Sequence, residues 1–280
     1  MLKIKIIMDK ELRYFTLPNI FTLLNLVAGS VAILFAFEKS GNLTYAATFI
    51  FIAAFFDFTD GFVARLTNSV SKSGKYLDSL SDIVSFGIAP AVIVYQMLKT
   101  AMEIKVFSVD LPYAQVLILL SPIVLIIAAA LRLAKFDADR RQTHHFLGLP
   151  VPISALFFAS LPLVNTFDPD NLLILKTWLD VNMPFDFILA VIGVQVYVLT
   201  NFWVYVVSIF VFAILQLLEI PMFSFKSDNY SFKVNAAKYS FLILAILMFA
   251  FFQCFIIPII IILYILFSVG IDIGNVFTKK

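Results

Sequence analysis

The sequence predicts an all-α fold: a polytopic membrane helical bundle of about eight transmembrane helices with both termini in the cytoplasm. Of the 280 residues, 62% are hydrophobic and 14% are charged, whereas a soluble domain is about half apolar and about a quarter charged. The apolar residues also come in runs long enough to cross a bilayer, for which a helix needs roughly 20 of them. Lys and Arg gather in alternate loops, as they do on the cytoplasmic side of membrane proteins.

Five apolar runs, each followed by a polar loop, predict the first five spans. They cover residues 18–37, 43–64, 76–98, 113–135 and 150–166. Two longer apolar stretches follow. Residues 187–218 are interpreted as one span with an interfacial extension, because an odd number of crossings must link an Asp-rich outer loop to a basic inner one. Residues 236–269 are interpreted as two spans that separate near Gln253 and Pro258.

Loop charge predicts the orientation. Basic residues mark the N-terminal segment, the loops after the second, fourth and sixth spans, and the C-terminal Lys279 and Lys280 as cytoplasmic. The Asp-rich loop 168–186 is then outside. A net charge of +2 gives no reason to expect a nucleic-acid partner. We therefore expect a multi-pass protein of the cell (inner) membrane whose partner is the lipid bilayer.

Four aspartates lie where a lipid-facing helix would not tolerate them. Asp57 and Asp60 end the second span, and Asp78 and Asp82 begin the third. A charge at membrane depth is costly unless it faces a polar cavity and has a partner. At about 100° per residue, each pair occupies one helix face, about 60° apart in the first pair and about 40° apart in the second. Because a short loop joins the two helices, both pairs are expected to converge at the cytoplasmic end of the membrane.

Converging carboxylates repel one another unless cations hold them. Hard oxygen ligands of this kind favour Mg²⁺ or Mn²⁺, and two such ions can neutralise a pyrophosphate during an in-line displacement. Gly61 and Gly74 would let phosphates or a nucleotide approach the backbone. Arg65 offers a bidentate fork for phosphate. These residues predict an enzyme of phosphoryl-group transfer that uses two divalent ions.

The segment from Asp57 to Asp82 resembles the signature of the CDP-alcohol phosphatidyltransferases. It reads Asp57-Phe-Thr-Asp60-Gly61-Phe-Val-Ala64-Arg65, eight residues, then Gly74-Lys-Tyr-Leu-Asp78-Ser-Leu-Ser-Asp82. Every fixed position of the signature is filled at the expected spacing. The resemblance implies a helical membrane enzyme that cleaves a CDP-activated lipid and transfers its phosphatidyl group to an alcohol.

The resemblance also implies a role for each motif residue. Asp57, Asp60 and Asp78 would bind metal, and Asp82 would deprotonate the alcohol and also touch metal. The CDP site would be lined by Gly61, Ala64, Arg65 and Gly74. From the first span, Asn19 and Thr22 are assigned to the CDP site and Asn25 to the acceptor site, because their side chains can hydrogen-bond a nucleotide or an alcohol.

Three further segments resemble phosphatidylserine synthases within this family. They are Leu17–Gly29, Leu131–Phe136 with Gly148–Pro152, and Ile220–Lys226. The resemblance implies CDP-diacylglycerol and L-serine as substrates, phosphatidylserine and CMP as products, and a possible homodimer. It covers residues 17–226, which we take as the catalytic core of a single domain spanning residues 1–280.

The acceptor and the reaction class leave alternatives. Arg132, and with it Lys135, could receive the carboxylate of serine, or both could be anchors that extend to the membrane surface. The acceptor could instead be choline, inositol or glycerol 3-phosphate, with Arg132 and Arg140 serving a phosphate. A cation transporter is the alternative from another class. Transport predicts acidic residues spread through the membrane depth, whereas these four cluster at one end.

Overall fold

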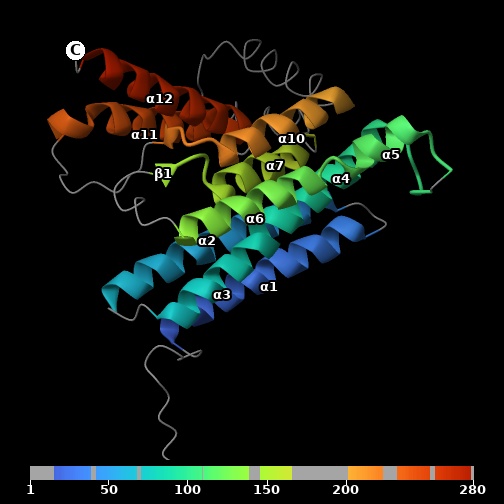
Figure 1. Ribbon diagram of the computed structural model, residues 1–280, viewed down its shortest axis with the longest axis horizontal. Helices are drawn as coiled ribbons and strands as arrows, with labels where there is room; N and C mark the ends of the chain where they lie inside the picture. Colours follow the sequence, from blue (N-terminus) through green and yellow to red (C-terminus); the bar gives the residue numbers. More distant parts are fainter. Residues whose placement is uncertain are drawn as a thin grey trace, which may run out of the picture.

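The computed structural model describes residues 16–38, 42–67, 71–108, 110–138, 146–165, 201–222, 232–252 and 256–278. Within these ranges the chain is almost entirely helical, with one two-stranded sheet (Figure 1). The elements in chain order are α1 (Leu17–Phe37), α2 (Leu43–Leu66), α3 (Lys72–Asp82), the π-helix η2 (Ile83–Ile88), α4 (Ala89–Ala101), α5 (Tyr113–Leu120), α6 (Ile123–Ala138), β1 (Phe146–Leu147), α7 (Val151–Asn165), α10 (Phe202–Leu217), β2 (Pro221–Met222), α11 (Phe232–Phe252) and α12 (Ile257–Thr278).

The helices include the membrane crossings that the sequence predicts. Among the described residues, four helical stretches are long and apolar enough to span a bilayer, which makes this a multi-pass membrane protein: Leu17–Phe37, Leu43–Leu66, Ser73–Ala101 and Tyr113–Ala138. Four further apolar helices are shorter: Val151–Val164, Phe202–Leu217, Lys238–Phe249 and Ile257–Gly270. The predicted break within 236–269 is present, since α11 ends at Phe252 and α12 begins at Ile257. The count of eight crossings and the side of each terminus stay predictions, and residues 187–200 lie outside the described part.

Helices α1 and α2 pack against each other along their length (Figure 1). Alanines such as Ala32 and Ala47 are fully buried in the core, and small residues of this kind let membrane helices approach closely. Leu34 and Phe58 are 71% and 69% exposed. A soluble protein would hide such large side chains, but in a bilayer they contact lipid at no cost. The other neighbours of α1 are α3, η2 and α4.

One continuous helical segment, α3–η2–α4, carries the second aspartate pair. It begins at Ser71, whose hydroxyl accepts a hydrogen bond of 3.0 Å from the Gly74 N–H and so caps the helix. The π-helix η2 follows directly after Asp82. Pro90 lacks the N–H that would bond to the Phe86 carbonyl, and the Ala89 N–H bonds to Val84, five residues back. The helix thus widens next to the aspartates, as π-turns often do at functional sites.

The strands β1 and β2 join two segments that are far apart in the sequence. Phe146 pairs with Met222 and Leu147 with Pro221, antiparallel. Gly148 follows with a φ of +79°, a conformation that favours glycine. Its N–H bonds to the Ile220 carbonyl at 2.9 Å. These contacts fix the start of α7 against the end of α10.

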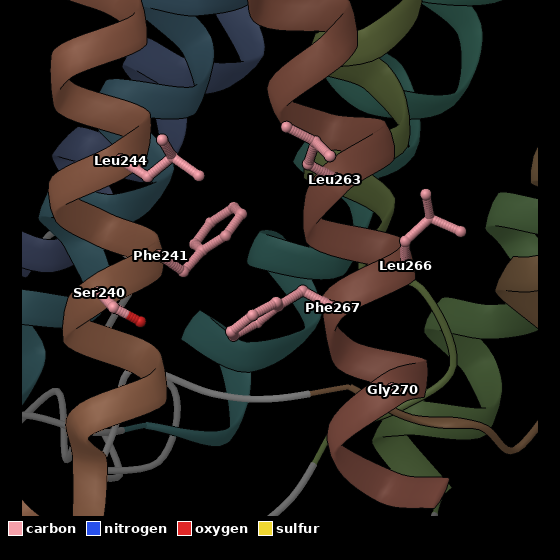
Figure 2. Close-up of a pocket in the computed structure, with 7 residues that line it drawn as sticks. All are labelled: Ser240, Phe241, Leu244, Leu263, Leu266, Phe267 and Gly270. Atoms are coloured by element: carbon pink, nitrogen blue, oxygen red, sulfur yellow. The ribbon is translucent and has the colours of Figure 1, made fainter. Parts of the chain in front are cut away.

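Helices α11 and α12 lie at one edge of the bundle (Figure 1). They line an open apolar cavity of about 520 Å³ (Figure 2). The rings of Phe241 and Phe267 stack across it, with centroids 5.6 Å apart. None of the seven residues drawn in Figure 2 is ionisable. This cavity therefore suits a lipid chain rather than group-transfer chemistry, and the candidate active site lies at the smaller cavity beside the aspartates.

Candidate active site

Three of the four aspartates converge as the sequence predicts. Asp57 and Asp60 of α2 and Asp78 of α3 each offer a carboxylate oxygen, and the three atoms lie within 4.8 Å of one another. Asp60 is 6% exposed, and the other two are half-buried. The Asp78 Oδ1 atom is buried without a hydrogen-bond partner among the described residues. Three carboxylates this close repel one another strongly in a medium of low dielectric constant, so the group fits a divalent cation with oxygen ligands.

Asp82 lies one helical turn beyond Asp78 and outside this group of three. It is 7% exposed. The Asn25 amide of α1 donates a hydrogen bond of 3.1 Å to its Oδ1 atom. The carboxylate still interacts electrostatically with Asp57 and Asp78. Asp82 is thus held by a side chain of α1 beside the three candidate metal ligands.

Helix α1 is fastened to the aspartate helices at several points. The Thr22 hydroxyl donates to Asp60 Oδ2 at 2.7 Å. The Ser81 and Ser85 hydroxyls donate at 3.0 Å to the carbonyls of Thr22 and Asn25. The contacts of Thr22 and Asn25 with aspartates were not predicted from the sequence. Their assignments to the CDP and acceptor sites stay predictions.

A cavity of about 190 Å³ opens beside the carboxylates. Five of the six residues predicted to bind CDP line it, namely Asn19, Thr22, Gly61, Ala64 and Gly74. The lining also includes residues that the sequence analysis did not identify: Pro18, Ser71 and Lys75. The cap position of Ser71, three residues before Gly74, is the sequence signal that could have identified it.

Two residues define the edges of this cavity. A Cβ atom at Gly74 would lie 2.8 Å from Asn19 Oδ1 and 2.9 Å from Ser71 Oγ, so only glycine leaves this wall open. Arg65 is exposed and does not line the cavity, but its Nη1 atom is the nearest neighbour of a Cβ built at Gly61, at 3.9 Å. Its guanidinium therefore lies just outside, within reach of a group that projects from the cavity.

The end of α6 is attached to the same region through Asp137. Its Oδ2 atom accepts a hydrogen bond of 2.7 Å from the Ser79 hydroxyl. Its Oδ1 atom forms an ion pair of 3.3 Å with the Lys75 ammonium group. Lys75 also lines the cavity. Its ion pair with Asp137 therefore fixes the position of a cationic side chain in the cavity wall.

The two predicted acceptor-site cations have different surroundings. Arg132 is 7% exposed, and its Nε atom is buried without a hydrogen-bond partner among the described residues. Its guanidinium interacts electrostatically with Asp82 and stands 5.8 Å from the centre of the Phe136 ring. Lys135 is exposed and forms an ion pair of 2.6 Å with Glu219. The structure therefore brings Arg132, and not Lys135, toward the aspartates.

Comparison with known proteins agrees with this geometry. A sequence model of the CDP-alcohol phosphatidyltransferases matches residues 15–185. The chain is 33% identical over 162 residues to archaetidylserine synthase of Methanothermobacter thermautotrophicus, a match that covers 57% of this chain and 63% of that protein. It is 34% identical over 140 residues to CDP-diacylglycerol–serine O-phosphatidyltransferase of Bacillus subtilis, covering 50% of this chain and 71% of that protein.

A third relative bears the same name as the Bacillus protein. It comes from Methanocaldococcus jannaschii and is 33% identical over 153 residues, a match that covers 54% of this chain and 63% of that protein. The matches thus span somewhat less than two thirds of the two archaeal relatives. The family match covers more than half of the chain and contains the whole segment from Asp57 to Asp82. With its helical membrane fold and its converging aspartates, the chain belongs to the CDP-alcohol phosphatidyltransferase family.

Proposed function

We propose that this protein transfers the phosphatidyl group of CDP-diacylglycerol to L-serine and releases phosphatidylserine and CMP. The observation that carries the proposal is the group of Asp57, Asp60 and Asp78 beside Asp82, of which Asp60 and Asp78 line a cavity. Relatives named for transfer to serine support serine as the acceptor. We further propose one domain with its catalytic core in residues 17–226, acting as a homodimer.

Asp57, Asp60 and Asp78 would hold Mg²⁺ or Mn²⁺. When bound, two such ions would neutralise the pyrophosphate of the CDP-lipid and stabilise the leaving CMP. The unpartnered Asp78 Oδ1 atom and the short distances among the three carboxylates support this role. The Thr22 hydroxyl on Asp60 would orient one of the ligands.

The nucleotide part of the substrate would occupy the cavity between α1, α2 and α3. Gly61 and Gly74 leave its walls open, and Asn19 and Thr22 contribute polar atoms. Arg65 would pair with a phosphate oxygen at the cavity edge. Lys75, which lines the same cavity, would add a second positive charge.

Asp82 would accept the proton of the serine hydroxyl. The serine oxygen would then attack the phosphorus that carries the diacylglycerol. A new P–O bond to serine would form as the bond from that phosphorus to the oxygen of CMP breaks, so CMP leaves with both bonding electrons. The Asn25 amide, which bonds to one oxygen of Asp82, would keep the other oxygen directed to the acceptor.

Arg132 would pair with the carboxylate of serine. It is buried and close to Asp82, which are the properties needed for a specific ion pair rather than a surface anchor.

We retain eight crossings, cytoplasmic termini and a catalytic face toward the cytoplasm as part of the proposal. Labelling of single cysteines placed in the loops 139–145 and 168–186 of a Cys254→Ser protein tests it, because only the second loop should react from outside the cell.

The decisive experiment is CMP release by the purified protein with CDP-diacylglycerol, Mn²⁺ and each alcohol in turn. We expect L-serine to be the preferred acceptor, and Asp82→Asn to lower kcat by about 10²–10⁴-fold, the usual contribution of a general base. Asp110→Asn, the same change at an exposed aspartate, is the matched control. Arg132→Ala should raise the KM for serine strongly. Metal uptake without any CMP release would favour the transporter instead.

A further inference from the structure

A second group of buried polar side chains lies on α6 and α10, two helices that pack together (Figure 1). An ion pair of 2.6 Å between Lys135 of α6 and Glu219, two residues after α10, joins the two helices at this end. Arg132 and Gln216 each precede a member of this exposed pair by three residues. Both are buried, at 7% and 3% exposure.

Each of these two side chains has one polar atom without a partner among the described residues. In Arg132 it is the donor Nε, and in Gln216 it is the acceptor Oε1. The Gln216 Nε2 atom donates a hydrogen bond of 2.9 Å to the Ser154 hydroxyl of α7, which leaves Oε1 as the amide atom without a partner. A buried unpartnered donor and a buried unpartnered acceptor are each costly unless a ligand satisfies them.

The backbone around Gln216 is unusually constrained. A Cβ atom at Gly148 would lie 2.8 Å from the Gln216 carbonyl oxygen, and the Leu149 N–H bonds to the Leu215 carbonyl at 2.9 Å. Strands β1 and β2 close the same junction. On the remaining side, Tyr264 of α12 is 7% exposed and interacts electrostatically with Arg132. Four helices thus meet at this layer of polar side chains.

We propose that Gln216 binds the ammonium group of the acceptor and thereby selects an amino alcohol that also carries a carboxylate. The inference rests on the proposed transfer to serine and on the pairing of its carboxylate with Arg132. An ammonium group offers three N–H donors and no acceptor, so the free Oε1 atom of Gln216 complements it. A neutral amide oxygen can accept a hydrogen bond from the ammonium group without adding a negative charge, which would compete with the aspartates for the metal.

This assignment explains how the other alcohols would be rejected. Inositol and glycerol 3-phosphate carry no ammonium group, and the quaternary nitrogen of choline has no N–H to donate. Choline would leave the Gln216 oxygen buried and unpaired, and a hydroxyl group of inositol or glycerol 3-phosphate would offer it only a neutral donor, which bonds less strongly than an ammonium group. Sites built to bond a polar group discriminate strongly against analogues that lack it. Gln216 would therefore be a specificity-determining residue.

The test uses the purified full-length protein with CDP-diacylglycerol and Mn²⁺. Gln216→Leu should raise the KM for L-serine about tenfold to a hundredfold, the effect of losing a hydrogen bond to a charged group. The KM for CDP-diacylglycerol and kcat at saturating serine should change little. Preference for serine over 3-hydroxypropionate, which lacks only the amine, should fall by the same factor. Gln216→Glu, which keeps an acceptor oxygen, should restore the serine KM.

Gln96→Leu is the matched control, since Gln96 is a half-buried glutamine elsewhere, on α4. If Gln216→Leu fails to fold, Ser154→Ala replaces it; loss of the bond that orients the amide should then raise the serine KM several-fold. A serine KM and preference unchanged in these variants would overturn the inference while leaving the proposed function intact. The inference would also be overturned if these variants lost kcat and affinity for CDP-diacylglycerol by the same factor as affinity for serine. A wild-type protein that uses an alcohol other than serine would overturn both.

Discussion

Gly29 of α1 gives the sharpest steric test of the site, because the backbone of η2 passes directly against it. A Cβ atom at this position would lie 2.6 Å from Ser85 Cα and 2.8 Å from Ser85 Cβ. Carbon atoms in contact ordinarily lie about 3.5–4.0 Å apart. The neighbouring atoms are backbone and a short side chain, so neither can turn away. Gly29→Ala therefore requires α1 and η2 to separate by about 1 Å.

The separation of α1 from η2 would affect Asp82, because Asn25 contacts both Ser85 and Asp82. The Asn25 carbonyl accepts a hydrogen bond of 3.0 Å from the Ser85 hydroxyl, and the Asn25 amide donates one of 3.1 Å to Asp82. Lengthening the second bond by about 1 Å takes it beyond hydrogen-bond range. A 1 Å misplacement of a catalytic group costs about 10²-fold in rate, and overpacking costs about 1–3 kcal/mol of stability. We expect both effects in Gly29→Ala.

The assay is CMP release at saturating CDP-diacylglycerol and serine, with thermal unfolding in detergent measured on the same samples. Gly270→Ala is the control, because a Cβ there meets nothing within 4 Å. It should be neutral or stabilising, since Ala is favoured over Gly in a helix by about 1 kcal/mol. A Gly29→Ala protein that keeps the wild-type kcat would refute the proposed link between α1 packing and Asp82.

Two further predictions concern the cavity and the metal. Gly74→Ala should raise the KM for CDP-diacylglycerol by about tenfold or more, because its methyl group narrows the cavity against Asn19 and Ser71; a KM equal to that of wild type would show that the nucleotide lies elsewhere. Chelation of divalent ions should abolish CMP release and lower the unfolding temperature, because Asp57, Asp60 and Asp78 then repel one another. Adding Mn²⁺ or Mg²⁺ should restore both CMP release and the unfolding temperature. An unfolding temperature that does not change with metal would count against these three residues as ligands.

Much of the site could be predicted because its signals are local. Asp57 and Asp60 stand three residues apart in one helix, and a short loop leads to the helix of Asp78. Helical geometry alone then predicts that the carboxylates converge, and the structure confirms it for these three. The spans could be predicted for the same reason, since a run of about 20 apolar residues is a local property.

Gln216 shows what could not be predicted. It is one polar residue at the end of a long apolar stretch, and no spacing or motif distinguishes it from a residue at a membrane surface. Its burial depends on Gly148 and on the β1–β2 pairing, which join segments some 70 residues apart in the sequence. The pairing register of β1 and β2 is set by tertiary contacts, and these leave no periodic pattern in the local sequence.

Helix α1 carries a stripe of polar residues and glycine that the sequence alone interprets only weakly, and whose contacts the tertiary structure shows. Asn19, Thr22, Asn25 and Gly29 are spaced by three or four residues, so they form one stripe along α1. In the structure this stripe meets Gly74, Asp60, Asp82 and Ser85 in turn. One helix thus contacts the cavity proposed for the nucleotide, one candidate metal ligand and the candidate base. Because these contacts share one helix, a shift of α1 would disturb metal binding and proton transfer together, and substitutions along the stripe should not be additive.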